Sequence, residues 1–248
     1  MRRVLAANWK MHHDPAAAVQ FALRFQEASL PRQGNDLWFF PPSISLAAAA
    51  EAFGRRPDIA VGAQNVYWEN KGAFTGEISP AMVSGCQGRG ALVGHSERRH
   101  IFGETDAETA KKVKALIAQR LTPMLCVGEK LQEREGGHTG DVVQRQLRAV
   151  LSELNVIEAA ELLVAYEPVW AIGTGKVARP QDASEVHRII RSTFQSFRVP
   201  GRVPVLYGGS VNLGNVAGLM AEDEIDGVLV GGASLEPEGW AALVAAAS

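Results

Sequence analysis

Short apolar runs alternate with longer amphipathic stretches along the chain, and this alternation constrains the fold most. The apolar runs, which are candidate strands, cover residues 4–7, 37–40, 59–63, 90–93, 124–127, 162–166, 205–207 and 227–230. Helical patterns cover residues 15–28, 43–53, 79–84, 105–120, 141–154, 179–197, 215–220 and 237–247. Strands separated by helices pair in parallel, because tight turns cannot join parallel neighbours. Eight such units predict a closed (β/α)8 barrel of the α/β class rather than an open doubly wound sheet.

Length and composition favour one domain over residues 1–248, since no Pro/Ser-rich or singly charged linker divides the 248 residues. A formal net charge of −2 gives no general attraction to nucleic acid or to an anionic membrane. No run is apolar for long enough to be a signal peptide or to span a bilayer. Cys86 and Cys126 form no CxxC pair, so neither a disulfide framework nor a zinc site is indicated. We expect a soluble cytoplasmic protein with small-molecule partners.

The sixth apolar run ends at a carboxylate. Residues 162–166 lack polar alternation, which is typical of a strand buried on both faces, so Glu167 lies where the strand leaves the core. Pro168 pushes Glu167 toward an extended backbone, which suits a positioned base. Residues 169–172 are too apolar for an ordinary loop. Residues 173–175, Gly-Thr-Gly, supply backbone amides, and the two glycines have no Cβ to block the approach of a ligand. We interpret this stretch as a lid with an apolar underside; the alternative is a plain strand-to-helix connection with a solvated Glu.

Polar side chains also follow the first and fourth runs. The carboxyl ends of barrel strands share one face, and that face carries the active site. Asn8 and Lys10 follow the first run and bring an amide and a cation, although such a Lys can equally be a solvated charge. His95 follows the fourth run, just before an N-cap-like Ser96 and a helical turn. Its ring can therefore accept backbone N–H groups at a positive dipole end, which favours a neutral imidazole; the alternative is a structural His.

Paired glycines follow the last two runs, at residues 208–209 and at Gly231 and Gly232. Such backbone amides allow an anion to approach closely, and loops after the seventh and eighth strands commonly bind phosphate in barrels. Each pair alone can be an ordinary turn, but together with residues 173–175 they predict a dianion site. The long loop at residues 66–77, after the third run, is expected to serve the site or an interface.

One carboxylate, one His, one Lys and a phosphate cradle, without metal-ligand spacing, suit proton abstraction next to a carbonyl. Glu167 would remove the proton, His95 would donate a hydrogen bond to the carbonyl oxygen, and Lys10 would stabilise the developing negative charge. The resulting enediolate is reprotonated on the neighbouring carbon. Lid closure would exclude water and hold the phosphate in plane, which prevents its elimination.

Three other functions remain open at this point. A Schiff-base aldolase would need a Lys within a barrel strand, whereas Lys10, Lys130 and Lys176 lie in loops or beyond strand ends. A metal-dependent sugar-phosphate epimerase would need His and carboxylate residues clustered on several strand ends, and the sequence lacks that pattern. A non-catalytic binder of phosphorylated metabolites would need only the glycine loops.

Six motifs carry a resemblance to a known family: NWKM at residues 8–11, GAFTGE at 72–77, GHSERR at 94–99, YEPVWAIGTGK at 166–176, YGGSV at 207–211 and VGGASL at 230–235. Together they make the chain resemble the triosephosphate isomerase family over its entire length. The resemblance implies interconversion of dihydroxyacetone phosphate and D-glyceraldehyde 3-phosphate without a cofactor or metal. A Glu base paired with a neutral His is a well-known feature of this family, so that assignment is not independent of the resemblance.

The resemblance also implies roles by matched motif. Glu167 would be the base, His95 the electrophile, Asn8 and Lys10 substrate contacts, Gly173, Ser210, Gly231 and Gly232 amide donors to the phosphate, and Glu97 the ion-pair partner of Lys10. The family is typically a homodimer, in which the loop matching Phe74 and Thr75 inserts beside the partner's active site. His12 and Val177 depart from the family's more usual Asn and Thr, which affects tuning rather than reaction type.

Overall fold

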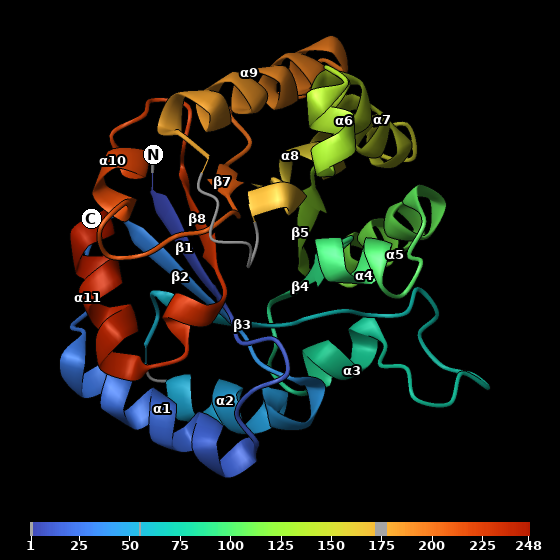
Figure 1. Ribbon diagram of the computed structural model, residues 1–248. Coiled ribbons are helices and arrows are strands. Elements are labelled where there is room, and N and C mark those ends of the chain that lie inside the picture. Colours follow the sequence, from blue (N-terminus) through green and yellow to red (C-terminus); the bar gives the residue numbers. More distant parts are fainter. Residues whose placement is uncertain (1, 55, 172–177) are drawn as a thin grey trace.

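In residues 2–54, 56–171 and 178–248, which the computed structural model describes, eight parallel strands close into a barrel in sequence order (Figure 1). The strands are β1 (Arg3–Asn8), β2 (Asn35–Phe40), β3 (Ile59–Ala63), β4 (Gly90–Val93), β5 (Thr122–Val127), β6 (Leu163–Tyr166), β7 (Val205–Tyr207) and β8 (Gly227–Val230). β1 pairs with both β2 and β8, which closes the sheet. The predicted closed (β/α)8 barrel is confirmed.

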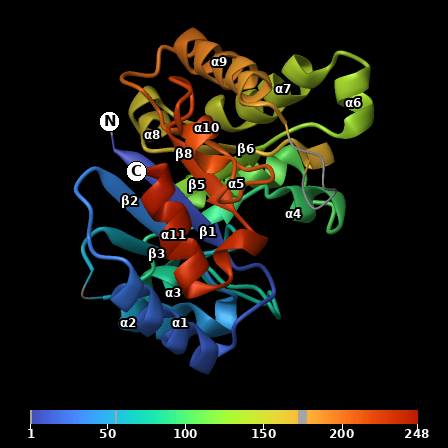
Figure 2. The same cartoon turned by 60° about the vertical axis from the view of Figure 1, so that its left-hand side comes forward.

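Helices surround the barrel on the outside (Figure 2). They are α1 (Pro15–Ala28), α2 (Leu46–Phe53), α3 (Pro80–Gly85), α4 (Ser96–His100), α5 (Asp106–Ala118), α6 (Leu131–Glu135), α7 (Thr139–Leu151), α8 (Val156–Ala160), α9 (Pro180–Ser196), α10 (Val216–Met220) and α11 (Pro237–Ala247), with 3-10 turns η1 (Ser43–Ser45), η2 (Val169–Ala171) and η3 (Gly232–Ser234). Each predicted helix is present, although residues 43–53 divide into η1 and α2. Helices α6 and α8, of five residues each, were not predicted from the sequence.

Local sequence explains where the longer helices begin. Asp14 accepts a hydrogen bond from the Ala17 N–H at the start of α1, and a proline occupies the first turn. At α5, Thr105 and Glu108 form a reciprocal capping box. Fixed helix starts set the path of each loop that leaves the carboxyl end of a strand.

Two strands begin at or next to a proline. β7 begins after Pro204, as predicted, but β5 begins two residues earlier than predicted and contains Pro123. The N–H of Thr122 donates to Arg89 on the β4 side, so the nitrogen of Pro123 faces the β6 side. Pairing of β5 with β6 begins only at Met124, and the missing N–H of Pro123 therefore leaves no gap in the ladder.

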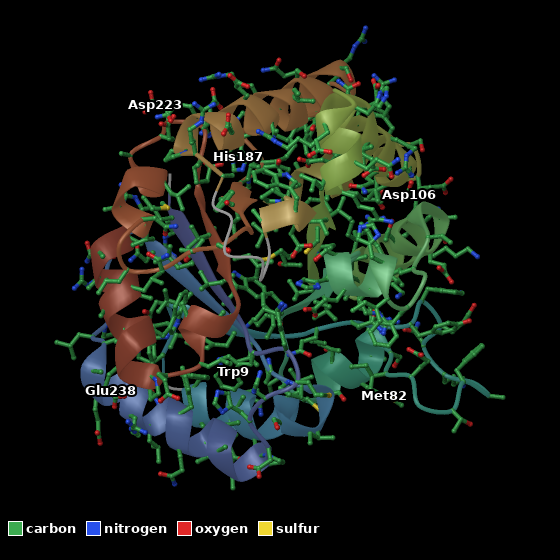
Figure 3. The ribbon with its side chains drawn as sticks, in the orientation of Figure 1. Trp9, Met82, Asp106, His187, Asp223 and Glu238 are labelled. Atoms are coloured by element: carbon green, nitrogen blue, oxygen red, sulfur yellow. The ribbon has the colours of Figure 1, made fainter. Side chains whose placement is uncertain are left out.

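The core has two parts, one inside the barrel and one between the barrel and the helices. Inside, the Trp38 and Phe40 rings stack with centroids 5.7 Å apart. Gly62 leaves room for this pair, since a Cβ there would lie 2.6 Å from the Phe40 ring. Outside, Trp9 is fully buried and packs on Phe21 of α1 (Figure 3). Among the described residues, none of the helices has the length and apolar character needed to cross a bilayer.

Candidate active site

A cavity of about 350 Å³ opens at the carboxyl end of the strands. The predicted site residues that the structure describes all line it: Asn8, Lys10, His95, Glu167, Ser210, Gly231 and Gly232. Gly173 and Val177 lie outside the described residues. The lining also includes Val211 and Ala233, which belong to the quoted motifs, and Asn212 and Leu229, which the sequence did not single out. The structure thus brings together residues from β1, β4, β6, β7 and β8.

Glu167 is held at both its backbone and its side chain. Its N–H donates to the Val127 carbonyl at 2.7 Å as the chain leaves β6. Its side chain is buried; Oε2 accepts the Ser96 N–H at 2.7 Å, and Oε1 lies 3.0 Å from His95 Nε2. Burial raises the pKa of Glu167, but the His95 ring and the Ser96 N–H outweigh burial and lower that pKa below its usual value. The carboxylate is therefore ionised at neutral pH.

His95 caps the helix that follows it. Its Nδ1 accepts the Glu97 N–H at 3.2 Å, so the prediction that the ring accepts a backbone N–H is confirmed. The prediction that Ser96 caps the helix is wrong. His95 has the non-helical backbone of a cap residue, and Ser96 is the first helical residue, whose N–H goes to Glu167. An acceptor at Nδ1 places the proton of the neutral ring on Nε2, the atom that faces Glu167.

The pKa of His95 depends on the position of Glu167. Burial lowers the pKa of His95, but the carboxylates of Glu167 and Glu97 outweigh burial and raise it in this arrangement. Lys10 acts in the same direction as burial. Displacement of Glu167 from the ring would remove the largest influence that favours the charged imidazole.

Lys10 projects into the cavity from a strained loop position. Its φ is +50°, and the Asn8 side-chain oxygen holds that conformation by accepting the Lys10 N–H at 3.0 Å. Gln64, which the sequence did not single out, donates to the Lys10 carbonyl at 2.7 Å. The Lys10 ammonium lies 2.6 Å from Glu97, so the ion pair expected from the resemblance is present.

The glycine loops border the other side of the cavity. Among the described residues, no heavy atom lies within 4 Å of an ideal Cβ on Gly232, so no described side chain or backbone fills the space beside this glycine. A Cβ on Gly209 would lie 2.2 Å from the Tyr207 hydroxyl, which explains the glycine there. The Ser210 hydroxyl donates to the Ala171 carbonyl at 2.6 Å and so joins the β7 loop to η2. Backbone amides in loops of this kind can bind an anion.

Glu129, which sequence analysis missed, anchors the start of the predicted lid. It is fully buried, and its Oε1 accepts the Tyr166 hydroxyl at 3.1 Å and the Trp170 indole N–H at 2.9 Å. Burial raises the pKa of Glu129. Residues 169–171 of the predicted lid form η2, while residues 172–176 lie outside the described residues.

Known proteins are similar to this chain over nearly its entire length. The model of the triosephosphate isomerase family matches residues 3–247. The chain is 45% identical to the triosephosphate isomerase of Syntrophotalea carbinolica, with 98% of each chain covered. It is 46% identical to that of Moorella thermoacetica, again with 98% of each chain covered. The enzyme of Bdellovibrio bacteriovorus is 45% identical, over 97% of this chain and 98% of its own.

Proposed function

The chain belongs to the triosephosphate isomerase family and is an isomerase, and from this premise we propose that it interconverts dihydroxyacetone phosphate and D-glyceraldehyde 3-phosphate through an enediolate. The observation that carries the proposal is the buried, ionised Glu167 beside His95, with Lys10 in the same cavity. That trio supports proton abstraction next to a carbonyl, since a base, a hydrogen-bond donor and a cation all reach one small volume.

Glu167 is the proposed base. Its lowered pKa keeps it ionised, and a substrate that displaces its carboxylate from Ser96 and His95 frees it to remove a proton from carbon 1 of the ketone. The electron pair moves to form the enediolate, and the carbonyl oxygen becomes negative. The proton of the carbon 1 hydroxyl then moves to the oxygen on carbon 2, and Glu167 returns its own proton to carbon 2, so that carbon 1 becomes the aldehyde carbonyl.

His95 and Lys10 are the proposed stabilisers of the developing oxyanion. The Glu97 N–H occupies His95 Nδ1, so Nε2–H is the donor available to the substrate oxygen. Once Glu167 turns to the substrate, burial and Lys10 favour the neutral ring. Asn8 holds the Lys10 backbone, so we assign it a positioning role as well as the expected substrate contact. Such preorganised donors act most strongly in a site shielded from water.

The phosphate is proposed to bind at the glycine loops. The amides of Ser210, Gly231 and Gly232 border the cavity, and Gly173 is assigned the same role by its motif. Binding energy from a phosphate remote from the reacting carbons can stabilise lid closure, which raises the rate without strengthening ground-state contacts at the carbonyl. No cofactor or metal enters this proposal.

The test is direct observation of the reaction by NMR with purified protein and dihydroxyacetone phosphate. We expect D-glyceraldehyde 3-phosphate to form, and His95→Gln to slow its formation by roughly 10²-fold or more. His100→Gln is the matched control, because His100 is exposed at the end of the same helix. Absence of product from the parent protein would contradict the proposal, as would equal rates for parent and His95→Gln.

We propose further that the protein acts as a homodimer, joined through the loop containing Phe74 and Thr75. Large apolar side chains are exposed near the cavity: Met11 is 94% exposed, Ile101 71% and Phe102 66%. They line a second cavity of about 500 Å³ that also borders Lys10 and His95. An apolar surface of this kind supports an interface with a second copy that inserts this loop.

Thr75→Arg tests the dimer. It places a charge in the exposed loop and is expected to lower both the sedimentation mass and the turnover. Gln195→Arg adds the same charge at an exposed position on α9 and should change neither. Unchanged mass and turnover in Thr75→Arg would contradict the proposed interface.

We also propose a cytoplasmic location and a role in glycolysis and gluconeogenesis. Cys86 and Cys126 are both free, which supports a reducing compartment. Substrate interconversion of the proposed kind is common to both pathways.

A further inference from the structure

Gln146 lies on α7, away from the cavity, yet it contacts the backbone that supports Glu167. We infer that Gln146 is a positioning residue for the proposed base and acts through Gly128. The inference rests on the proposed function, since it assigns Glu167 as the group to be positioned. Two hydrogen bonds join Gln146 to Gly128, and the backbone of Gly128 contacts that of Glu167. The residues on either side of Gly128 bind the backbone next to Glu167.

Gln146 makes two hydrogen bonds to one residue. Its Oε1 accepts the Gly128 N–H at 2.8 Å, and its Nε2 donates to the Gly128 carbonyl at 3.1 Å. The side chain is only 3% exposed. Gly128 follows the last residue of β5, where ladder pairing has stopped, and it is buried. Buried peptide groups need partners, and one carboxamide supplies both the acceptor and the donor.

Gly128 in turn touches the backbone of Glu167. A Cβ on Gly128 would lie 1.8 Å from the Glu167 carbonyl oxygen and 2.6 Å from its carbonyl carbon. The two main chains are therefore in direct contact, with no space for a side chain between them. Close-packed interiors transmit small displacements, so a shift of Gly128 moves Glu167 as well.

The neighbours of Gly128 bind the chain on each side of Glu167. The Val127 carbonyl accepts the Glu167 N–H at 2.7 Å, and the Glu129 carbonyl accepts the Val169 N–H at 3.1 Å. Residues 127–129 thus form a support segment under residues 167–169. Gln146 fixes the central residue of this segment, which ladder hydrogen bonds do not hold.

This geometry predicts a separation of kcat from KM. Among the described residues, the side-chain hydrogen bonds of Gln146 go to Gly128 alone. The proposed phosphate contacts that the structure describes lie after β7 and β8, and Lys10 lies after β1. Loss of the Gln146 bonds should therefore displace the base and leave substrate binding almost intact. Misplacement of a reacting group by about 1 Å can cost about 10²-fold in rate.

Gln146→Met is the first test, because Met has a similar length and lacks both hydrogen bonds. We expect kcat to fall about tenfold or more, with KM changed less than about twofold. Leu147→Ala is the matched control: Leu147 is the next residue on α7, is fully buried and makes no part of the support segment. It should lower the melting temperature and leave kcat at the parent value. Equal kcat in Gln146→Met and the parent, or equal losses in both variants below their melting temperatures, would overturn the inference.

Gln146→Glu gives a pH signature that a purely structural role would not produce. A protonated carboxyl can restore both bonds to Gly128, whereas an ionised one can accept but not donate. Burial raises the pKa of a carboxyl group. The ratio of kcat in this variant to kcat in the parent should therefore rise as the pH falls from about 8 to about 6, and the same ratio for Gln146→Met should stay flat. A flat ratio for Gln146→Glu would overturn the proposed hydrogen-bond mechanism.

The two levels of the proposal fail in different ways. A parent protein that neither forms product nor exchanges substrate protons would refute the proposed function and this inference with it. A fully active parent, with Gln146→Met and Gln146→Glu indistinguishable from it at every pH, would refute the positioning role alone.

Discussion

At the carboxyl end of the strands Glu167 and His95 border a cavity of about 350 Å³, whereas at the amino end Asp226 is enclosed by two arginines. Asp226 Oδ2 accepts the Val205 N–H at 2.8 Å and Arg191 Nη2 at 2.6 Å. Its Oδ1 accepts Arg202 Nε at 3.1 Å and Nη2 at 2.9 Å. Both oxygens of the Asp226 carboxylate therefore accept two hydrogen bonds each from groups of the protein itself.

The charged groups at the amino end of the barrel stabilise the fold, whereas those at the carboxyl end are placed to act on a ligand. A buried charge surrounded by protein partners serves the fold, while buried charges that share a cavity have perturbed pKa values and room for a ligand. Cavity size does not locate the site, since a larger cavity of about 820 Å³ lies at the amino end around Trp38 and Leu163. The arrangement of charges distinguishes the two ends, and the variants below test that distinction.

The largest effect on stability is expected from Asp226→Ala. Removal of this carboxylate leaves the buried Val205 N–H without an acceptor, Arg202 without a carboxylate and Arg191 with Glu224 alone, which should lower the free energy of unfolding by about 3–5 kcal/mol. Urea unfolding followed by circular dichroism measures the loss. The kcat per folded molecule should equal that of the parent; a large loss of kcat would show that the two ends are not separable.

Lys10→Met should have the opposite profile. Loss of the cation that faces the cavity is expected to lower kcat/KM by about 10²–10³-fold. The free energy of unfolding should change by less than about 1 kcal/mol, because the pair with Glu97 is partly exposed. Lys114→Met, at an exposed pair with Glu153, is the control and should leave both quantities unchanged. Parent-like kcat/KM in Lys10→Met would remove this residue from the proposed chemistry.

His187 should give the amino end a dependence on acid. It belongs to α9 (Figure 3) and is fully buried, and its Nδ1 lies 3.0 Å from the Glu224 carbonyl oxygen, which also accepts a hydrogen bond from Arg191. Burial lowers the pKa of His187 to about 4. Between the unfolded pKa of about 6.5 and this value the unfolded chain binds the proton more tightly, so stability is lost as the pH falls.

The shift corresponds to roughly 3 kcal/mol of stability, present above about pH 6.5 and lost by about pH 4. His187→Gln keeps a donor for the Glu224 carbonyl and removes the titration, so the difference in unfolding free energy between parent and variant should depend on pH over this window. Urea titrations at several pH values measure that difference. If the difference in unfolding free energy between the parent and His187→Gln did not change with pH, the claim that His187 is buried as a neutral ring would be contradicted.

Arg24→Ala should have the smallest effect. Arg24 and Glu238 form a two-bond pair between α1 and α11, but both side chains are more than half exposed. Solvent-exposed pairs contribute about 0–1 kcal/mol, so the unfolding free energy should fall by less than about 1 kcal/mol. If Arg24→Ala lowered the unfolding free energy as much as Asp226→Ala, burial of the partners of Asp226 would not explain its contribution to stability.

The barrel and most of the site could be predicted from the sequence. Apolar runs mark strands locally, and in a barrel every residue just beyond a strand reaches the same face, so Lys10, His95 and Glu167 converge whatever their loops do. The cap at His95 rather than Ser96 could not be predicted, because it depends on one backbone conformation. Gly173 falls outside the described residues, so its position as well as its role stays a prediction.

Contacts between residues far apart in the chain give weaker signals in the sequence than the strands and helices do. Glu129 and Gln64 act on residues tens of positions away, and their local sequence does not mark them. Gln146 does give a signal in the sequence, because it lies between Val143 and Val150 on the buried stripe of α7, where a polar residue is unexpected. A polar side chain on an apolar stripe indicates a buried partner, but the sequence does not say which one.

The central claim is that Glu167 removes a substrate proton, and hydrogen exchange tests it most directly. Dihydroxyacetone phosphate in deuterated water is followed by NMR with the parent protein and with Glu167→Gln. We predict rapid loss of the carbon-bound proton together with formation of D-glyceraldehyde 3-phosphate in the parent, and a rate lower by about 10²–10⁴-fold in the variant. Parent-like exchange in Glu167→Gln, or no exchange in a parent that still binds the substrate, would contradict the claim.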